Sequence, residues 1–279
     1  MTAFTSATRI AGVIGWPVGH SKSPLIHNYW ARRYGIDAAY GAFPVAPGRM
    51  DEAVRGLAAL GLAGANVTVP HKEAALRAAD HPDALASRIG AANTLVVRPD
   101  GTVAATNTDA FGFLENLRQG APDWDPSAGP VLVVGAGGAA RAVIVALIDA
   151  GARILLTNRT DSRAAALAAE FGAEVTAVEW NRRAEAVAEA LTVVNTTAAG
   201  MQGQPALDLP LAGLDPAALV TDLVYAPLET RLLAEARARG AATVDGLGML
   251  LHQARPAFQA WFGVLPEVDD TLRAMVLAA

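Results

Sequence analysis

The chain has 279 residues, of which 52% are hydrophobic and 18% charged, and its formal net charge at pH 7 is −5. This length fits two average domains or one large α/β domain, and the apolar content excludes an intrinsically disordered chain. The absence of cysteine excludes disulfides, thiolate metal sites and a thiol nucleophile. An acidic balance without basic runs argues against a nucleic-acid partner and favours chemistry on a small molecule.

The first 24 residues lack a basic region followed by a sustained apolar run, so we expect no signal peptide and a cytoplasmic location. The longest apolar run, residues 142–157, contains Asp149, Gly151 and Arg153. These residues interrupt it before it reaches the ~20 residues that span a bilayer. We therefore expect no membrane segment.

Short β-branched runs alternate with longer Ala- and Leu-rich stretches in the first part of the chain. The alternation predicts strands and helices in turn at residues 9–15, 24–35, 38–45, 50–61 and 64–70. This βαβα order is typical of a mainly parallel sheet covered by helices.

A second series of the same kind starts at residue 129. It predicts a strand, a helix and a strand within residues 129–160, and further strands at residues 174–180, 191–197, 218–225 and 241–246. Residues 118–130, rich in Pro, Gly and Asp, form a loop between the two α/β units. The domain border lies either at this loop or before it, at a helix following Asp109. Residues 248–266 and 267–279 predict two final helices that can cap either unit.

A glycine pattern opens the second unit. Gly135, Gly137 and Ala140 match G-x-G-x-x-G/A between a buried strand and a helix. Gly135 allows a tight turn, Gly137 lets a pyrophosphate approach the backbone, and Ala140 permits close packing of helix on strand. Because a second strand ends at the right distance, at residue 157, the pattern favours a dinucleotide site over a tight turn without a ligand.

The residues after that second strand indicate which dinucleotide is bound. NAD sites usually carry an acidic residue there, whereas this chain has Asn158, Arg159 and, one helical turn later, Arg163. Guanidinium groups bind a 2′-phosphate through charge-assisted hydrogen bonds. Asp161 is the dissenting residue, and we interpret it as the start of the next helix. The sequence thus predicts NADP rather than NAD.

Polar residues of the first unit gather after predicted strands. Ser21 and Ser23 precede a helix that begins at Pro24, where Ser23 has the features of an N-cap and Ser21 has no such structural explanation. Two hydroxyls beside a helix N-terminus are suited to a carboxylate. His20 and His27 lack the spacing of a metal pair with a third ligand, and we interpret both as structural.

Lys72 follows Pro70 in the first turn of a predicted helix, where a cation is disfavoured by roughly 0.3–1 kcal/mol. A solvated surface lysine is the simple explanation. Thr68 and Asn66 lie at the end of the preceding strand. Two further polar residues have simple explanations when taken alone: Asn93 as a turn residue before a strand, and Asp109 as the cap of the following helix. These alternatives stay open at the level of single residues.

Taken together, these segments resemble the shikimate dehydrogenase family. They are "HSKSP" (20–24), "NVTVPHK" (66–72), "GAANTL" (90–95) and "ATNTDAFGF" (105–113), followed by the glycine pattern and "NRT" (158–160). The segments 195–201, 222–230 and 246–263 are similar to the family as well. The resemblance runs from about Gly12 to Gly263. It implies an α/β fold of two domains: a substrate-binding domain, residues 1–108 plus 246–279, and a Rossmann NADP-binding domain, residues 109–245.

The family's reaction is the reversible reduction of 3-dehydroshikimate to shikimate with NADPH. The resemblance implies that Lys72 is the acid/base and that Asp109 pairs with it and with a substrate hydroxyl. The implied substrate-binding residues are Ser21 and Ser23 for the carboxylate, Thr68, Asn93 and Gln253 for ring hydroxyls, and Tyr225 beside the carboxylate and nicotinamide. The implied cofactor-binding residues are Gly135, Ala136, Gly137, Gly138, Ala139, Asn158, Arg159, Thr160, Arg163, Leu223 and Gly246.

Several alternatives remain. A dual-specificity quinate/shikimate dehydrogenase shares this framework, and a non-catalytic NADPH-binding regulator is expected to lose Lys72 or Asp109, which are both present. A folate-processing or amino-acid dehydrogenase explains the Rossmann half but not the two serines. We expect no metal, no nucleic acid and no membrane partner, and either a monomer or a homodimer.

Overall fold

The computed structural model describes residues 4–279. Contacts within the chain divide it into unit 1, Met1–Thr108 with Leu251–Ala279, and unit 2, Asp109–Leu250. The sequence-based border placed the second junction at residue 246. It falls later because helix α10, Leu247–Phe262, is one continuous helix that begins in unit 2 and ends in unit 1.

Unit 1 is built on a six-stranded sheet with the order β2-β1-β3-β5-β6-β4. Its strands are β1 Arg9–Gly15, β2 Ala38–Pro44, β3 Gly64–Val67, β4 His81–Pro82, β5 Thr94–Val97 and β6 Val103–Thr106. Strand β1 runs parallel to β2 and β3, which are three of the strands that the alternation predicted.

The sheet is mainly parallel, as expected, and its exception is β5, which is antiparallel to both β3 and β6. The reason is a tight turn between β5 and β6. Arg98 N donates a 2.8 Å hydrogen bond to Thr102 O, and Gly101 takes φ +83°. A short hairpin reverses the chain directly, whereas parallel neighbours need a crossover connection.

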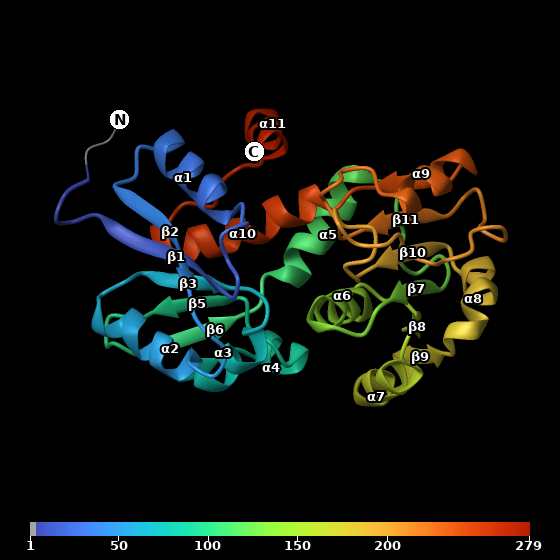
Figure 1. The fold of residues 1–279 in the computed structure, drawn as a ribbon, viewed down its shortest axis with the longest axis horizontal. Coiled ribbons are helices and arrows are strands. Elements are labelled where there is room, and N and C mark those ends of the chain that lie inside the picture. The colour runs from blue at the N-terminus through green and yellow to red at the C-terminus, as the bar shows by residue number, and fades with distance from the viewer. Residues whose placement is uncertain (1–3) are drawn as a thin grey trace. The chain divides into compact units, whose positions relative to one another are not determined.

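Helices cover both faces of this sheet (Figure 1). They are α1 Ser23–Arg33, α2 Met50–Ala59, α3 Lys72–Ala78, α4 Ala84–Ile89, the later part of α10, and α11 Asp270–Ala278. On one face α2, α3 and α4 bury apolar residues such as Met50 and Ala75 against Ile14 of β1. On the other face Trp30 of α1 and Phe258 of α10 are fully buried.

Unit 2 is a six-stranded sheet whose strands all run parallel, in the order β12-β11-β10-β7-β8-β9. Its strands are β7 Val131–Val134, β8 Ile154–Thr157, β9 Val175–Val178, β10 Thr192–Asn195, β11 Leu219–Asp222 and β12 Ala242–Val244. Its helices are α5 Asp109–Gly120, α6 Gly138–Asp149, α7 Asp161–Phe171, α8 Arg183–Glu189, α9 Arg231–Ala238 and the first turn of α10.

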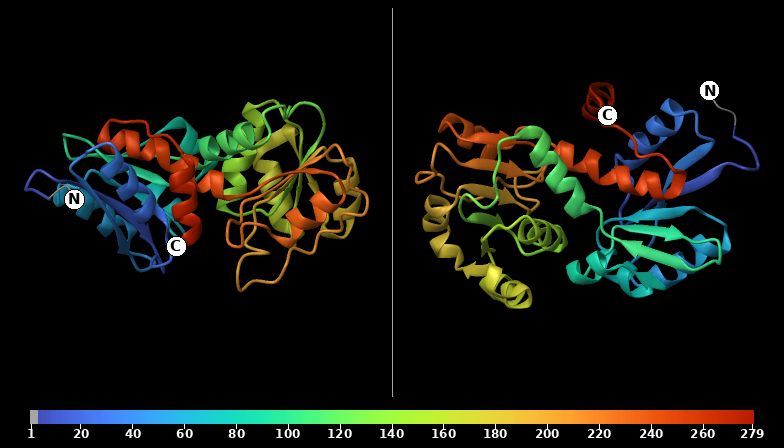
Figure 2. Two further views of the ribbon diagram at one scale, coloured as in Figure 1. Left: turned by 90° about the horizontal axis from the view of Figure 1, so that it is seen from above. Right: turned by 180° about the vertical axis from the view of Figure 1, so that it is seen from behind.

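This strand order is that of the Rossmann fold. From β7, the chain adds strands first on one side, as β8 and β9, and then on the other, starting with β10, so the switch point lies between β7 and β10. Ligands of such sheets bind outside the carboxyl ends of the strands at that point. The views from above and behind in Figure 2 show the twisted sheet of unit 2 with helices on both faces.

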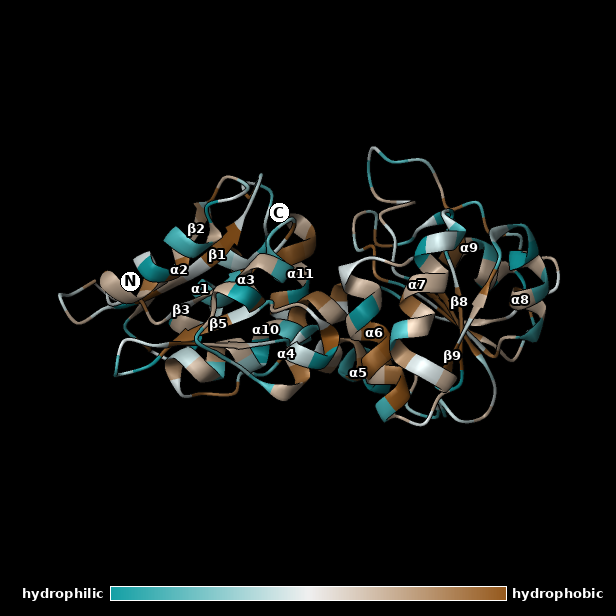
Figure 3. Cartoon of the chain, turned by 90° about the horizontal axis from the view of Figure 1, so that it is seen from below, coloured by the Kyte–Doolittle hydropathy of each residue, from teal (hydrophilic) through white to brown (hydrophobic). Residues whose placement is uncertain are grey.

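Burial explains the apolar runs of unit 2. Every residue of β7 and most residues of α6 are buried, because helices cover the parallel sheet on both sides. Figure 3 shows α6 largely in brown, whereas the outward side of α8 is teal.

Candidate functional site

The polar residues of unit 1 lie at the carboxyl ends of β1 and β3. These two strands are parallel neighbours, and Trp16 N donates a 3.2 Å hydrogen bond to Val69 O just beyond them. Thr68 follows β3 directly and is half-buried. Lys72 is the first residue of α3, which confirms its predicted position in a first helical turn. Its side chain is half-buried rather than fully solvated.

Asn93 is a buried, hydrogen-bonded residue of this group, only 2% exposed. Its Oδ1 accepts hydrogen bonds from Thr108 N at 2.8 Å, Thr94 Oγ1 at 3.0 Å and Thr108 Oγ1 at 3.1 Å. Its Nδ2 donates to Gln253 Oε1 at 3.4 Å. The fold therefore brings together two predicted substrate-binding residues, Asn93 just before β5 and Gln253 of α10. The side-chain oxygen of Asn93 already accepts hydrogen bonds from the protein.

Asn66 has a structural task beside this pair. Tyr40 Oη donates to Asn66 Oδ1 at 2.7 Å, and Asn66 Nδ2 donates to Asn93 O at 3.2 Å. Burial raises the pKa of Tyr40 well above its usual range, against smaller opposite effects of its hydrogen bonds with Ser23 and Asn66. These groups form a neutral, buried support under Asn93.

The expected N-cap role of Ser23 is wrong. Helix α1 begins at Ser23 itself, its N-cap position is Lys22, and no side chain caps it. Ser21 explains the difference: its Oγ accepts a hydrogen bond from Ser23 N at 3.3 Å, and so binds the first helical N–H in place of a cap. Ser23 is 7% exposed and Ser21 half-buried.

His27 is a packing residue, as the sequence suggested. Its ring stacks on Tyr40 with 4.1 Å between ring centroids and lies within an aromatic group that includes Trp30 and Trp261. Neither ring nitrogen has a hydrogen-bond partner among the described residues. Burial lowers the pKa of His27 to about 3, and the opposing influence of Asn66 is smaller. Within residues 4–279 no group of three His, Asp or Glu side chains is arranged to hold a metal ion.

The glycine turn of unit 2 has the steric features that the sequence predicted. Gly135 has φ +111°, and a Cβ there would lie 2.6 Å from Thr196 Oγ1. Gly137 is the N-cap of α6, and a Cβ on it would meet nothing within 4 Å, so its backbone faces open space. Ala140 is fully buried. This turn therefore offers the exposed backbone N–H groups at a helix N-terminus that a pyrophosphate needs.

The segment after β8 presents two guanidinium groups. Arg159 and Arg163 are exposed, and the side chains of both lack a hydrogen bond or ion pair with other residues in the range 4–279. Asn158 Nδ2 donates to Thr160 O at 3.0 Å, which fixes the turn. Asp161 is the first residue of α7, as expected, and its Oδ1 accepts a 2.7 Å hydrogen bond from Trp180 N.

One pocket of unit 2, with a volume of about 620 Å³, joins these features. Six of the predicted cofactor residues line it: Gly135, Ala136, Gly137, Asn158, Arg159 and Arg163. The other predicted residues do not: Gly138, Ala139, Thr160, Leu223 and Gly246. Sequence reasoning missed Trp180 and the segment 204–208, which line the pocket too. The segment 196–199 also lines it and lies within the family-like segment 195–201. The one sequence signal for Trp180 was its position at the end of the predicted strand 174–180.

The remaining predicted residues of unit 2 lie beyond β11 and at the start of α5. A Cβ on Gly246 would lie 2.5 Å from Leu223 O, so the two backbones are in close contact. Tyr225 is half-buried, and burial raises its pKa. Asp109 is the first residue of α5 and is 6% exposed.

An α/β unit interrupted by a parallel Rossmann unit, whose pocket joins a glycine turn to two exposed arginines, is the architecture of a two-domain, NADP-linked dehydrogenase. Three family models match the chain: the shikimate dehydrogenase substrate binding domain at residues 13–95, shikimate / quinate 5-dehydrogenase at 123–202, and the shikimate 5′-dehydrogenase C-terminal domain at 246–276. The chain belongs to the shikimate dehydrogenase family.

Relatives of known name agree over the whole length. Shikimate dehydrogenase (NADP(+)) of Paramagnetospirillum magneticum is 59% identical over 271 residues, 97% of this chain and 98% of that one. Shikimate 5-dehydrogenase of Thermus thermophilus, solved with NADP(H) and shikimate, is 39% identical with a TM-score of 0.86, covering 97% and 98%. Quinate dehydrogenase of Corynebacterium glutamicum, solved with NAD, is 31% identical with a TM-score of 0.90, covering 98% and 99%.

Proposed function

We propose that this chain catalyses the reversible, NADPH-dependent reduction of 3-dehydroshikimate to shikimate, a step of aromatic amino acid biosynthesis in the cytoplasm. The chain's full-length similarity to enzymes named for this reaction supplies the chemistry. The structural observation that carries the substrate assignment is the Asn93–Gln253 contact. It gathers two amide side chains at one end of the sheet of unit 1, as binding several ring hydroxyls requires.

Unit 1 supplies the substrate groups in this proposal. Because Ser21 Oγ accepts from a backbone N–H, its own O–H stays a donor toward a carboxylate, and Ser23 adds a second hydroxyl. Because Asn93 Oδ1 accepts three hydrogen bonds from the protein, Asn93 serves the substrate as a donor through Nδ2. Thr68 and Gln253 complete the hydroxyl-binding set.

Lys72 carries the acid/base role. NADPH, when bound, supplies the hydride to the carbonyl carbon of the substrate. The ammonium group of Lys72 stabilises the negative charge that develops on the carbonyl oxygen and donates the proton to it. Asp109 has the supporting role of accepting hydrogen bonds from Lys72 and from a substrate hydroxyl.

Unit 2 binds the cofactor. The glycine turn at Gly135 to Gly138 and the N-terminus of α6 receive the pyrophosphate, and Ala139 continues that first turn. Asn158, Arg159, Thr160 and Arg163 surround the 2′-phosphate. Leu223, Tyr225 and Gly246 serve the nicotinamide end. The pocket that joins the glycine turn to the arginine pair fits a dinucleotide phosphorylated at its 2′ position.

Dual specificity for quinate and shikimate is the second candidate function, favoured by the likeness to the quinate dehydrogenase that was solved with NAD. The decisive experiment measures NAD(P)H formation by the purified protein with shikimate or quinate and NADP or NAD, in all four combinations. The proposal expects kcat/KM to favour shikimate with NADP by orders of magnitude. Comparable turnover of quinate contradicts it in favour of dual specificity, and no turnover despite tight NADPH binding indicates a regulator.

Within residues 4–279 no helix has the length and apolar character needed to cross a membrane. A monomer or homodimer remains part of the proposal. Sedimentation velocity of the purified chain tests it, and a larger assembly would contradict it.

A further inference from the structure

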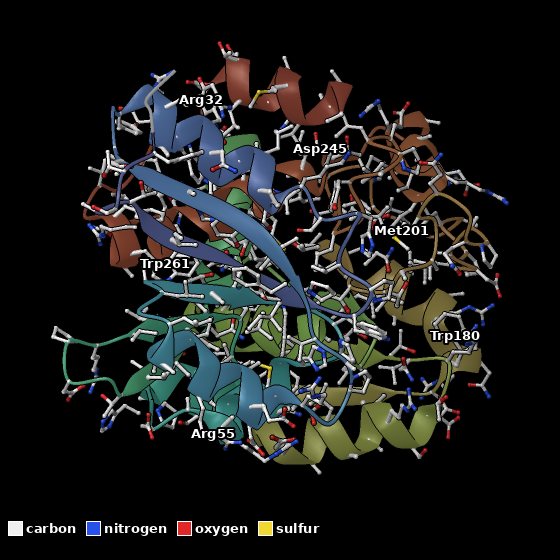
Figure 4. The ribbon with its side chains drawn as sticks, turned by 60° about the vertical axis from the view of Figure 1, so that its left-hand side comes forward. Arg32, Arg55, Trp180, Met201, Asp245 and Trp261 are labelled. Carbon is white, nitrogen blue, oxygen red and sulfur yellow. The ribbon has the colours of Figure 1, made fainter. Side chains whose placement is uncertain are left out.

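Trp180 contributes an aromatic ring to the pocket lining, and the proposed chemistry does not use it. It opens a short 3₁₀ turn, Trp180–Arg182, after β9, and it is half-buried (Figure 4). Its backbone N–H donates to Asp161 Oδ1 at 2.7 Å. Because Asp161 follows the turn that bears Arg159, this bond ties Trp180 to the arginine side of the pocket.

Arg183 holds Trp180 from the other direction. Its guanidinium carbon lies 4.7 Å from the centre of the Trp180 ring, and its Nη1 donates to Trp180 O at 2.8 Å. Its Nε and Nη2 donate to Asp208 O at 2.9 Å and Asp208 Oδ2 at 2.7 Å. The Arg183 side chain is only 17% exposed. One guanidinium therefore joins the indole to the segment 204–208, which forms part of the pocket wall.

The order of features along the pocket points to an occupant for this wall. The glycine turn is suited to the pyrophosphate, and Arg159 with Arg163 is suited to the 2′-phosphate. In NADP the adenine is attached to the ribose that carries the 2′-phosphate. The base must therefore lie within one sugar of the arginine pair. Besides Val134 and the segment 196–199, the remaining pocket residues are Trp180 and the segment 204–208, and the bond from Trp180 N to Asp161 Oδ1 places Trp180 on the arginine side.

We propose that Trp180 binds the adenine ring of NADP through its indole, and that Arg183 is a positioning residue that fixes both the indole and the segment 204–208 through Asp208. This inference rests on the proposed function for the identity of the cofactor. Aromatic side chains bind bases by stacking. The cation–π contact with Arg183 holds the half-buried indole of Trp180 in place.

The first test uses the adenosine half of the cofactor alone. Adenosine 2′,5′-bisphosphate is titrated by calorimetry into wild type, Trp180→Leu and Trp180→Phe. We expect the Leu variant to bind about tenfold more weakly and the Phe variant to recover most of the affinity, because stacking needs a flat ring. Equal affinity of the Leu variant and wild type, with both folded by circular dichroism, overturns the inference.

Fluorescence gives a second readout from the same indole. The chain has five tryptophans. Adenosine 2′,5′-bisphosphate should quench part of the emission of wild type and leave that of Trp180→Phe unchanged. Quenching that persists in full in Trp180→Phe contradicts contact between the base and Trp180.

Arg183→Met tests the positioning role, with Arg182→Met as a matched control. Arg182 is the preceding residue and pairs at the surface with Glu185 rather than with Asp208. Arg183→Met should raise the KM for NADP about tenfold and leave the KM for shikimate unchanged, whereas Arg182→Met should change neither. An equal effect of the two variants overturns the role of Arg183.

The proposed function and this inference fail in different experiments. A wild type that binds the bisphosphate through Trp180 but turns over no shikimate contradicts the proposed function alone. A wild type active on shikimate and NADP whose bisphosphate affinity ignores Trp180 contradicts the inference alone.

Discussion

Asn195 Nδ2 donates a 2.9 Å hydrogen bond to Asp222 Oδ1, linking the last residues of the neighbouring strands β10 and β11. The same carboxylate accepts from Val224 N at 3.0 Å and Thr230 Oγ1 at 2.7 Å. Asn195 Oδ1 in turn accepts from Thr197 N and Thr197 Oγ1. A buried carboxylate therefore holds both the pocket segment 196–199 and the segment that carries Tyr225.

Replacing Asp222 with alanine should destabilise unit 2 by about 2–4 kcal/mol, because three buried donors lose their acceptor. Urea unfolding measures this change. Asp215→Ala is the control, since its exposed carboxylate accepts one hydrogen bond, from Ala217 N, and its loss should cost less than about 1 kcal/mol. Similar losses for the two variants would contradict the role of the buried network.

Acid should destabilise the protein through His27. Its pKa is about 3 in the folded chain because of burial, against an ordinary value of 6.5. Between about pH 3 and pH 6.5, His27 is therefore protonated in the unfolded chain and neutral in the folded chain. The contribution of His27 to stability is therefore intact above pH 6.5 and falls as the pH drops toward 3, by up to about 5 kcal/mol.

His27→Phe keeps the stacking on Tyr40 and removes this proton linkage. Urea unfolding at several pH values between 7 and 4 should show a smaller loss of stability in the variant than in wild type. Parallel pH profiles for the two proteins would show that His27 titrates normally.

The two turn glycines should respond differently to alanine. Gly135→Ala should lower the melting temperature, because the residue has φ +111° and the added Cβ meets Thr196 Oγ1 at 2.6 Å. Gly137→Ala meets nothing within 4 Å, so it should fold normally and instead raise the KM for NADP by crowding the pyrophosphate. Thermal unfolding and cofactor titration separate the two effects, and wild-type cofactor affinity in Gly137→Ala would argue against binding at this turn.

Lys72→Ala should lower kcat by orders of magnitude with a modest change in the KM for shikimate, because both the proton donor and the positive charge are lost. Lys72→Arg keeps the charge but not a readily released proton, and should recover little of the rate. Steady-state kinetics in both directions give the result. Near-normal kcat in Lys72→Ala would remove this residue from the chemistry.

Arg159→Ala should raise the KM for NADPH far more than the KM for NADH, because only the former carries the 2′-phosphate. Arg153→Ala is a suitable control: Arg153 is exposed and precedes β8, at the opposite end of the strand. Equal changes in the KM values for NADPH and NADH in Arg159→Ala would contradict the binding of the 2′-phosphate by Arg159.

Much of the fold was predictable from local patterns. The strands from β1 to β3 and from β7 to β12 follow short apolar runs, and the helices between them follow from Ala- and Leu-rich stretches. The antiparallel β5 was not predictable in this way. Its direction depends on the turn at Gly101 and on pairing with both neighbours, and a strand's periodicity carries no direction.

The candidate site divides in the same manner. The steric roles of Gly135 and Ala140 and the helical start at Lys72 depend on neighbouring residues alone, and the sequence predicted them. The N-cap interpretation of Ser23 was wrong because helix α1 begins at Ser23 itself, and the hydroxyl of Ser21 accepts a hydrogen bond from the Ser23 N–H.

The sequence by itself determined the two α/β series and the glycine turn, because backbone sterics and periodicity act over a few neighbouring positions. The family followed from the resemblance of its motif segments. Only the tertiary structure decided that Gln253 meets Asn93, that Arg183 joins Trp180 to Asp208, and that Asp222 is held by Asn195. These contacts join residues from separate elements, and packing of the elements, rather than any local preference, sets which side chains meet.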